Sequence, residues 1–131
     1  MKITLNELKG MEMGLNTVMS MGLPAKTAYW FKRFMDRVVS EMNAFENKRK
    51  ALVIKYAKKD KNGKPVLKKV KKGEPAEYDV SKEDMVKVRA EFDEMFHKEF
   101  DIPFEPIKLE QFGDTKIKPD TLYQLGKLVV E

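Results

Sequence analysis

The sequence predicts a mostly α-helical α+β protein, and three observations lead to this fold class. Apolar residues recur at helical spacing over two long stretches, an Asn-Gly turn separates these stretches, and prolines near the C-terminal end favour extended chain. A chain of 131 residues is typical of one domain and can bury a core without disulfides. We therefore expect residues 1–131 to form a single domain, built on a long helix that pairs antiparallel with a second helix.

The long helix begins at Pro24, a residue that suits the first turn of a helix. Its apolar side chains follow a heptad pattern, at Ala28, Phe31, Met35, Val38, Met42, Phe45, Leu52 and Tyr56. No Gly or Pro interrupts residues 25–57. The pattern predicts a helix over residues 24–57, which would be about 50 Å long at 1.5 Å per residue and would need a partner along its apolar stripe.

A second helix is expected over residues 81–101. Ser81 is a good N-cap, acidic residues follow it in the first turn, and Pro103 would end the helix. Its apolar stripe consists of Met85, Val88, Phe92, Met95, Phe96 and Phe100. The two stripes can close on each other within one chain. Alternatively, part of the longer stripe can form the face of a homodimer, made of Phe45, Arg49, Leu52 and Tyr56.

Short elements are expected at both ends of the chain. Residues 1–5 read as a short strand, followed by a helix that Asn6 caps and that ends before Gly22. The apolar face of this helix would comprise Leu8, Met11, Leu15, Val18 and Met19. Gly10 and Gly14 would each weaken it by about 1 kcal/mol relative to Ala.

The C-terminal tail combines an extended segment with a short helix. Pro103 and Pro106 make residues 102–109 extended and edge-like, and a turn follows at residues 113–114. Pro119 and Asp120 open the last helix. Its apolar face is expected to consist of Leu122, Leu125, Leu128 and Val129.

Positive charge is concentrated between the two main helices. Residues 46–75 contain twelve Lys or Arg and three acids, a net charge of +9 in a chain whose total is +5. Within them, an Asn62-Gly63 turn and two short apolar segments, 66–70 and 76–80, favour an exposed β-hairpin or loop over residues 58–80, here called the basic insert. Its lysines are the candidate partner- or phosphate-binding residues: Lys58, Lys59, Lys61, Lys64, Lys68, Lys69, Lys71 and Lys72.

Three interpretations of this charge remain open: an acidic protein partner, nucleic acid, and solubility alone. Segregated charge can attract a polyanion, and lysines contact phosphates without reading bases. Arg49 is the only arginine in residues 46–75, whereas arginine is the residue preferred for bidentate base contacts. Sequence-specific recognition of nucleic acid is therefore not expected.

The residues that support catalysis are few. The chain has no cysteine, so disulfides and thiolate metal sites are excluded, and no Gly-rich phosphate loop is present. Its one histidine, His97, would lie between Asp93 and Asp101 on the second helix. A single histidine makes a poor transition-metal site. We expect no catalytic residues, metal or cofactor, and an enzyme centred on His97 is the least favoured alternative.

The sequence contains no pattern typical of a secretory signal and no apolar run of membrane-spanning length, so a soluble intracellular protein is expected.

One arrangement of motifs is similar to that of a known protein family. Leu23-Pro24-Ala25-Lys26-Thr27 leads into the long helix, Tyr56-Ala57-Lys58-Lys59-Asp60-Lys61-Asn62-Gly63 forms the turn, and Tyr78-Asp79-Val80 precedes an acidic helix and a Pro-Ile-Lys-Leu tail at residues 106–109. This arrangement resembles a family of small proteins of unknown function from tailed bacteriophages and prophages.

The resemblance spans most of the chain and implies a phage gene product in the bacterial cytoplasm or the virion. No functional residues transfer from it, because the family carries no assigned activity. With the charge pattern, it favours a non-enzymatic interaction protein, either a virion or assembly component or a modulator of a host protein machine. Non-specific nucleic-acid binding through residues 46–75 is the alternative, and neither prediction involves a membrane.

Overall fold

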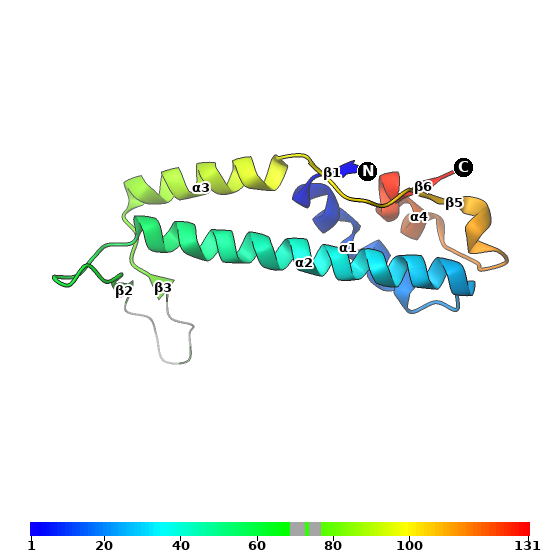
Figure 1. The fold of residues 1–131 in the computed structure, drawn as a ribbon, viewed down its shortest axis with the longest axis horizontal. Helices are drawn as coiled ribbons and strands as arrows, with labels where there is room; N and C mark the ends of the chain where they lie inside the picture. Colours follow the sequence, from blue (N-terminus) through cyan, green and yellow to red (C-terminus); the bar gives the residue numbers. More distant parts are fainter. Residues whose placement is uncertain (69–72, 74–76) are drawn as a thin grey trace. The chain divides into compact units, whose positions relative to one another are not determined.

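The computed structural model describes residues 1–68, 73 and 77–131. The chain is mostly helical with two-stranded sheets, which confirms the predicted α+β class (Figure 1). It divides into two compact units: residues 1–42 with 96–131, here the terminal unit, and residues 43–95, here the helix-pair unit. The expectation of a single domain stays a prediction.

The long helix forms where the sequence places it. Helix α2 spans Ala25–Tyr56, within one residue of the predicted range at each end, and packs with α1 and α3. Its first turn is closed by Ala28, whose N–H donates to the carbonyl of Pro24 at 2.9 Å. The other α-helices are α1 (Leu5–Met19), α3 (Lys82–His97) and α4 (Pro119–Leu125).

Helix α3 ends four residues before the predicted limit of 101, so that prediction is wrong at its C-terminal end. Phe100–Asp101 instead form strand β4, which pairs antiparallel with strand β1 (Lys2–Ile3). The amino group of Met1 lies 3.1 Å from a carboxylate oxygen of Asp101. The N-terminal strand is thus confirmed, and its pairing uses the backbone groups that a longer α3 would need. The predicted start of α3 is confirmed, because Ser81 caps the helix: the N–H of Asp84 donates to the hydroxyl of Ser81.

Helix α1 begins two residues earlier than predicted. Its N-cap is Thr4 rather than Asn6, because Thr4 and Glu7 form a capping box in which each side chain accepts a hydrogen bond from the other's backbone N–H, at 3.1 and 3.0 Å. Glu7 also binds the ammonium group of Lys127 at 2.9 Å. The start of α1 is therefore held to the C-terminal end of the chain.

The capping box predicts a stability that depends on pH. Partial burial raises the pKa of Glu7, but hydrogen bonds from Lys127 and from the Thr4 N–H outweigh it and hold the pKa below its ordinary value of 4.5. The ionised carboxylate thus stabilises the fold above that pH, and the contribution is lost as the pH falls through the lower, folded-state pKa. Glu7→Gln should lower the unfolding free energy near neutral pH, and urea titrations should show the difference from wild type shrinking below about pH 4.5. A difference that stays constant through the acidic range would contradict this role.

Most buried apolar side chains belong to the terminal unit. The predicted face of α1 is buried at Leu8, Met11, Leu15 and Val18, whereas Met19 is exposed, against expectation. In α2, Phe31 and Val38 are buried as predicted, but Phe34 and Thr27 are buried as well. The hydroxyl of Thr27 donates to the carbonyl of Gln111, so this face of α2 is wider than the heptad pattern indicated.

The C-terminal tail, residues 102–131, forms short strands, two 3-10 turns and helix α4. Strand β5 (Ile107–Lys108) pairs in parallel with β6 (Val129–Val130), and 3-10 turns η1 (Leu109–Phe112) and η2 (Gly126–Leu128) connect the segments. The extended character of residues 102–109 was expected. Val129 was expected on the last helix and lies in a strand instead, because α4 ends at Leu125 and Gly126 takes a φ of +54°.

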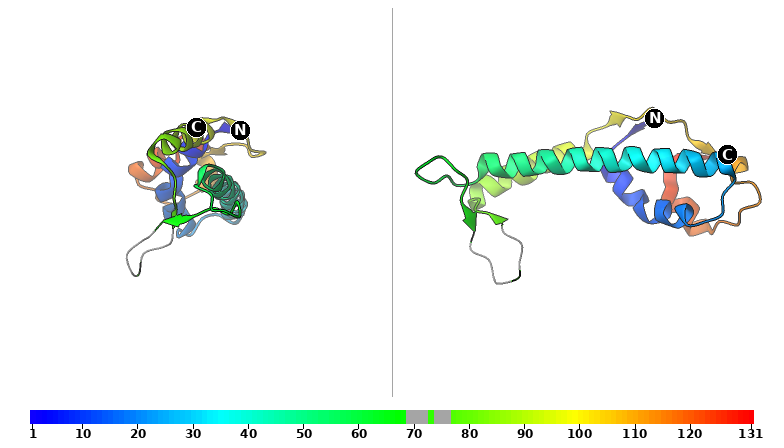
Figure 2. Two further views of the ribbon diagram at one scale, coloured as in Figure 1. Left: turned by 90° about the vertical axis from the view of Figure 1, so that its left-hand side faces the viewer. Right: turned by 60° about the horizontal axis from the view of Figure 1, so that its bottom comes forward.

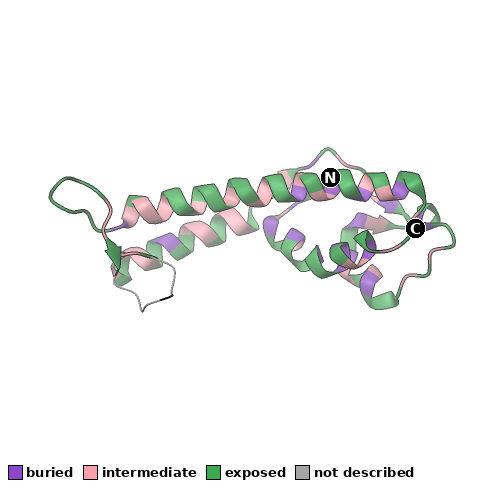
Figure 3. Cartoon of the chain, turned by 90° about the horizontal axis from the view of Figure 1, so that it is seen from below, coloured by how far each residue is buried: buried purple, intermediate pink, exposed green. Residues whose placement is uncertain are grey.

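The helix-pair unit contains the C-terminal part of α2, most of α3 and a small hairpin, in which β2 (Leu67–Lys68) pairs with β3 (Glu77–Tyr78). Among its described apolar residues only Ala57 and Val88 are buried. Figure 3 shows that positions along the two helices are mostly intermediate or exposed. Two helices can cover only one face of each other, so the unit keeps part of its apolar surface open.

Candidate interaction site

The base of the basic insert is locked by three backbone hydrogen bonds. Lys58 N–H donates to the Asp79 carbonyl, Val66 N–H to the Lys58 carbonyl, and Asp79 N–H to the Val66 carbonyl, each at 2.8 Å. Three chain segments therefore meet where the insert leaves the helices, and strands β2 and β3 lie side by side there (Figure 2). The hairpin prediction is confirmed for the described residues.

The Asn62-Gly63 turn is fixed by Asp60. Its carboxylate accepts hydrogen bonds from the N–H groups of Asn62 and Lys64, at 2.8 and 2.9 Å. Gly63 has a φ of +75°, a conformation that glycine adopts without strain. A bridge between Lys59 and Pro65 closes the turn. The backbone that carries Lys61 and Lys64 is consequently ordered by local bonds.

The candidate lysines fall into two groups. Lys58 forms an ion pair with Asp79 at 3.6 Å, and Lys59 donates to the carbonyl of Ile54 in the last turn of α2, so both brace the insert. Lys61, Lys64 and Lys68 are exposed. The remaining candidates, Lys69, Lys71 and Lys72, lie outside the described residues.

An apolar side chain lies among the exposed lysines. Leu67 is 55% exposed, directly before Lys68 in β2 and opposite Tyr78 in β3. Sequence reasoning treated residues 66–70 as a strand and did not single Leu67 out. An exposed leucine beside ammonium groups suits a protein surface that offers both apolar and acidic side chains.

The proposed dimer face is partly occupied by α3. Phe45, Arg49, Leu52 and Tyr56 are all half-buried. The hydroxyl of Tyr56 donates to Glu91 of α3 at 3.4 Å, and Arg49 pairs with Glu46 on its own helix at 3.0 Å. The contact between Tyr56 and Glu91 favours closure within one chain at that end of the stripe.

An open apolar groove adjoins that stripe and shares Leu52 with it. Its volume is about 440 Å³, and it lies between α2 and α3 within the helix-pair unit. Its lining residues are Lys48, Ala51, Leu52, Lys55, Glu91, Glu94 and Met95. The cationic residues all come from α2 and the acidic ones from α3, so the two walls carry opposite charge.

The terminal unit carries an aromatic pocket that sequence reasoning missed. Trp30 stacks on Phe34 with ring centroids 5.0 Å apart, and Phe104 packs edge-on against both rings. The guanidinium of Arg33 lies 5.7 Å from the centroid of Tyr29 and 5.9 Å from that of Phe104. The adjacent aromatics of the Tyr29–Phe34 stretch could have signalled this cluster.

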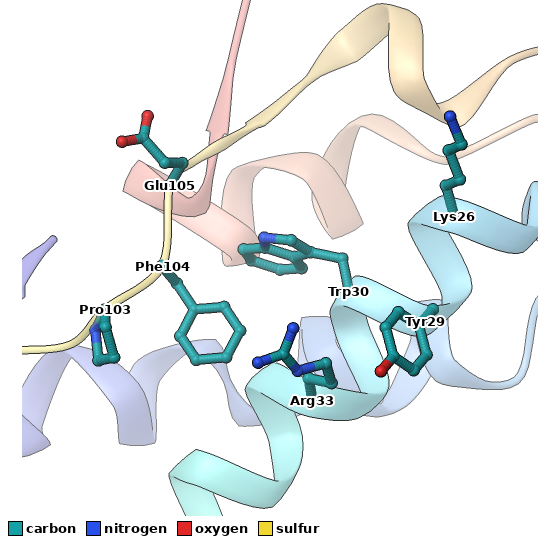
Figure 4. A pocket seen from close by; sticks show the side chains of 7 residues that line it. All are labelled: Lys26, Tyr29, Trp30, Arg33, Pro103, Phe104 and Glu105. Carbon is teal, nitrogen blue, oxygen red and sulfur yellow. The ribbon is translucent and has the colours of Figure 1, made fainter.

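Figure 4 shows the open side of this pocket, with the ring of Trp30 facing Phe104 and Arg33 between Phe104 and Tyr29. The pocket volume is about 330 Å³, and Lys26, Pro103 and Glu105 complete its lining. Its rings hold the proline-rich segment 103–106 against α2. Packing of the core therefore accounts for the cluster.

His97 does not lie between two helical carboxylates as expected. The helix ends at His97, and Asp101 lies in β4, where it binds the amino group of Met1. The imidazole packs edge-on against Phe96, with ring centroids 5.6 Å apart. Over residues 1–68, 73 and 77–131, no group of three or more His, Asp or Glu side chains is placed to hold a metal ion.

None of the helices in the described part of the chain has the length and apolar character that crossing a membrane requires. Comparison of the chain with protein-family models, curated proteins and solved structures finds no match.

Proposed function

We propose that this chain is a non-enzymatic interaction protein that docks on an acidic protein partner through the basic insert. The observation that carries the proposal is the ordered backbone in the described part of the insert, residues 58–68 and 77–80, with its three-way base and its Asp60-closed turn. A loop that serves only solubility needs no fixed backbone. Preorganised lysines lose less conformational entropy on binding than mobile ones, so the order favours a binding role.

The exposed side chains favour protein over nucleic acid as the partner. Leu67 offers apolar contact area between the lysines, whereas binding to a single strand relies on exposed aromatic rings. Tyr78 within the insert and Tyr56 just before it are poorly placed for stacking, because Tyr78 is half-buried and Tyr56 contacts Glu91. Non-specific binding of duplex phosphates through the same lysines is the second candidate, since it needs only positive charge.

The cellular setting belongs to the same proposal. The resemblance to small tailed-phage proteins supports a role in the bacterial cytoplasm or the virion, as an assembly component or a modulator of a host protein machine. A basic insert suits either role, because both require recognition of another protein. We propose no catalytic step, metal or cofactor for this chain.

Charge reversal of the described exposed lysines tests the proposal. A variant with Lys61, Lys64 and Lys68 changed to Glu should keep its helix content by circular dichroism, because these side chains make no described ion pair. As bait in a pull-down from phage-infected bacteria, it should lose a partner that wild type retains, and the purified partner should bind the variant at least about 100-fold more weakly, since three charge contacts each worth about 1 kcal/mol become repulsive.

The matched control changes Lys9, Lys98 and Lys116 to Glu, which alters net charge equally in exposed positions of the terminal unit. This control should bind the partner like wild type. Equal loss in both variants would show that net charge, rather than the insert, controls binding. Binding of the wild-type protein to a mixed-sequence DNA duplex at physiological salt would instead favour non-specific nucleic-acid binding as the function.

A further inference from the structure

The helix-pair unit has more apolar surface than a single chain covers. Its described apolar side chains are buried only at Ala57 and Val88. The half-buried ones are Phe45, Leu52, Val53, Ile54, Tyr56, Val66, Tyr78, Val80, Met85, Phe92 and Met95. Leaving so many apolar side chains half exposed forgoes burial free energy that a second pair of helices would recover.

The groove between α2 and α3 indicates which partner would fit. Lys48 and Lys55 form one wall, seven residues apart and therefore on one face of α2, while Glu91 and Glu94 form the other wall. None of these four side chains forms an ion pair with another described residue. Glu91 accepts a hydrogen bond from Tyr56 at 3.4 Å, and Lys55 lies 5.3 Å from the centre of the same ring, so the opposite charges of the two walls are not neutralised within the chain. The floor between the walls is made by Ala51, Leu52 and Met95.

We infer that this groove is the interface for a second copy of the same chain. A two-fold axis along the groove would lay α2 of one copy over α3 of the other, because that rotation exchanges the two walls. Lys48 and Lys55 of each copy would then face the wall formed by Glu91 and Glu94 of the other. The arrangement is isologous, so each favourable charge contact forms twice.

The helix directions agree with this arrangement. Because α2 and α3 run antiparallel, the same two-fold axis makes α2 antiparallel to α3 of the second copy as well. All neighbouring helices then run in opposite directions, as in common four-helix bundles. The small side chain of exposed Ala51 would allow the facing helices to approach closely. This inference differs from docking through the basic insert, since the two surfaces share no residue.

Two charge-reversed chains test the inference. Light scattering on wild type should give twice the chain mass of 15.3 kDa at the highest concentrations and dissociation on dilution. Lys48→Glu with Lys55→Glu makes both walls acidic, and Glu91→Lys with Glu94→Lys makes both walls basic. Each variant alone should be a folded monomer. Mixed at equal concentration, they should form a one-to-one heterodimer, because both pairs of facing walls become complementary.

A third variant and a control complete the test. The chain that carries all four substitutions exchanges the signs of the two walls, and it should be a dimer like wild type. Lys50→Glu with Lys82→Glu changes the net charge as much as the first variant but alters no groove residue, and it should remain dimeric. A wild-type mass of 15.3 kDa at every concentration would overturn the inference, as would dimers that persist in both charge-reversed variants.

Discussion

Replacement of Phe34 by Ala should lower the free energy of unfolding of the terminal unit by about 3–5 kcal/mol, a large fraction of the stability of a typical domain. Phe34 is fully buried in α2. Its ring lies nearly parallel to that of Trp30, at an interplanar angle of 5°, and Phe104 packs edge-on at 5.5 Å. Truncation would leave a cavity and would also remove the stacking contacts that hold segment 103–106 on α2.

The measurement is urea unfolding followed by circular dichroism and by tryptophan fluorescence. Trp30 is the only tryptophan of the chain, so its emission reports on this cluster alone. The matched control is Tyr29→Ala on the same helix, where the side chain is 66% exposed and the expected loss is below about 1 kcal/mol. Similar losses in the two variants would contradict the placement of Phe34 in the core.

Gly10 and Gly14 should respond to alanine with opposite signs. Both lie in α1, but a Cβ at Gly14 would come within 2.9 Å of the Cβ of Gln124 and 3.3 Å of the backbone of α4. Overpacking of this kind costs about 1–3 kcal/mol. At Gly10 an added Cβ meets no atom within 4 Å, so Gly10→Ala should raise stability by up to about 1 kcal/mol through helix propensity.

Thermal unfolding of the two variants and wild type checks this pair of expectations. The design is internally matched, because the same atom is added four residues apart in one helix. Gly14→Ala should melt below wild type and Gly10→Ala above it. A gain in stability at both positions would show that α1 and α4 do not approach closely at Gly14.

Much of the fold follows from periodicity and breakers in the sequence. The range of α2 was predictable because no Gly or Pro interrupts it. The Asn62-Gly63 turn was predictable because glycine adopts the positive φ that Gly63 takes. The C-terminal end of α3 was not predictable in the same way. Phe100 continues the helical stripe in sequence, but pairing with Lys2–Ile3, nearly one hundred residues away, determines its conformation.

Part of the candidate site was likewise predictable from the sequence, and part was not. Charge counting located the basic insert, because lysine content is visible without a structure. It did not show that Lys58 and Lys59 brace the insert rather than extend from it. The contact of Lys58 with Asp79 depends on how the chain returns, and the contact of Lys59 with Ile54 depends on where α2 ends. The aromatic pocket was not predicted, because a strict heptad pattern assigns Phe31 and Met35 to the buried face and leaves out Trp30 and Phe34. A wider helical stripe would have included both.

The glycines of α1 illustrate the same limit. From the sequence, Gly10 and Gly14 were equivalent defects in one helix. The structure distinguishes them, because α4 packs closely over Gly14, while Gly10 is exposed. Close approach between elements distant in sequence is a tertiary property, and no local pattern in residues 5–19 encodes it.

Light scattering tests the proposed role of the basic insert most directly. The purified protein is measured at physiological salt, once with polyglutamate and once with a mixed-sequence duplex oligonucleotide. We predict a complex with polyglutamate that disappears when Lys61, Lys64 and Lys68 are changed to Glu, and no stable complex with the duplex. No complex with polyglutamate, or an equal complex with the charge-reversed variant, would contradict an acidic partner for this insert.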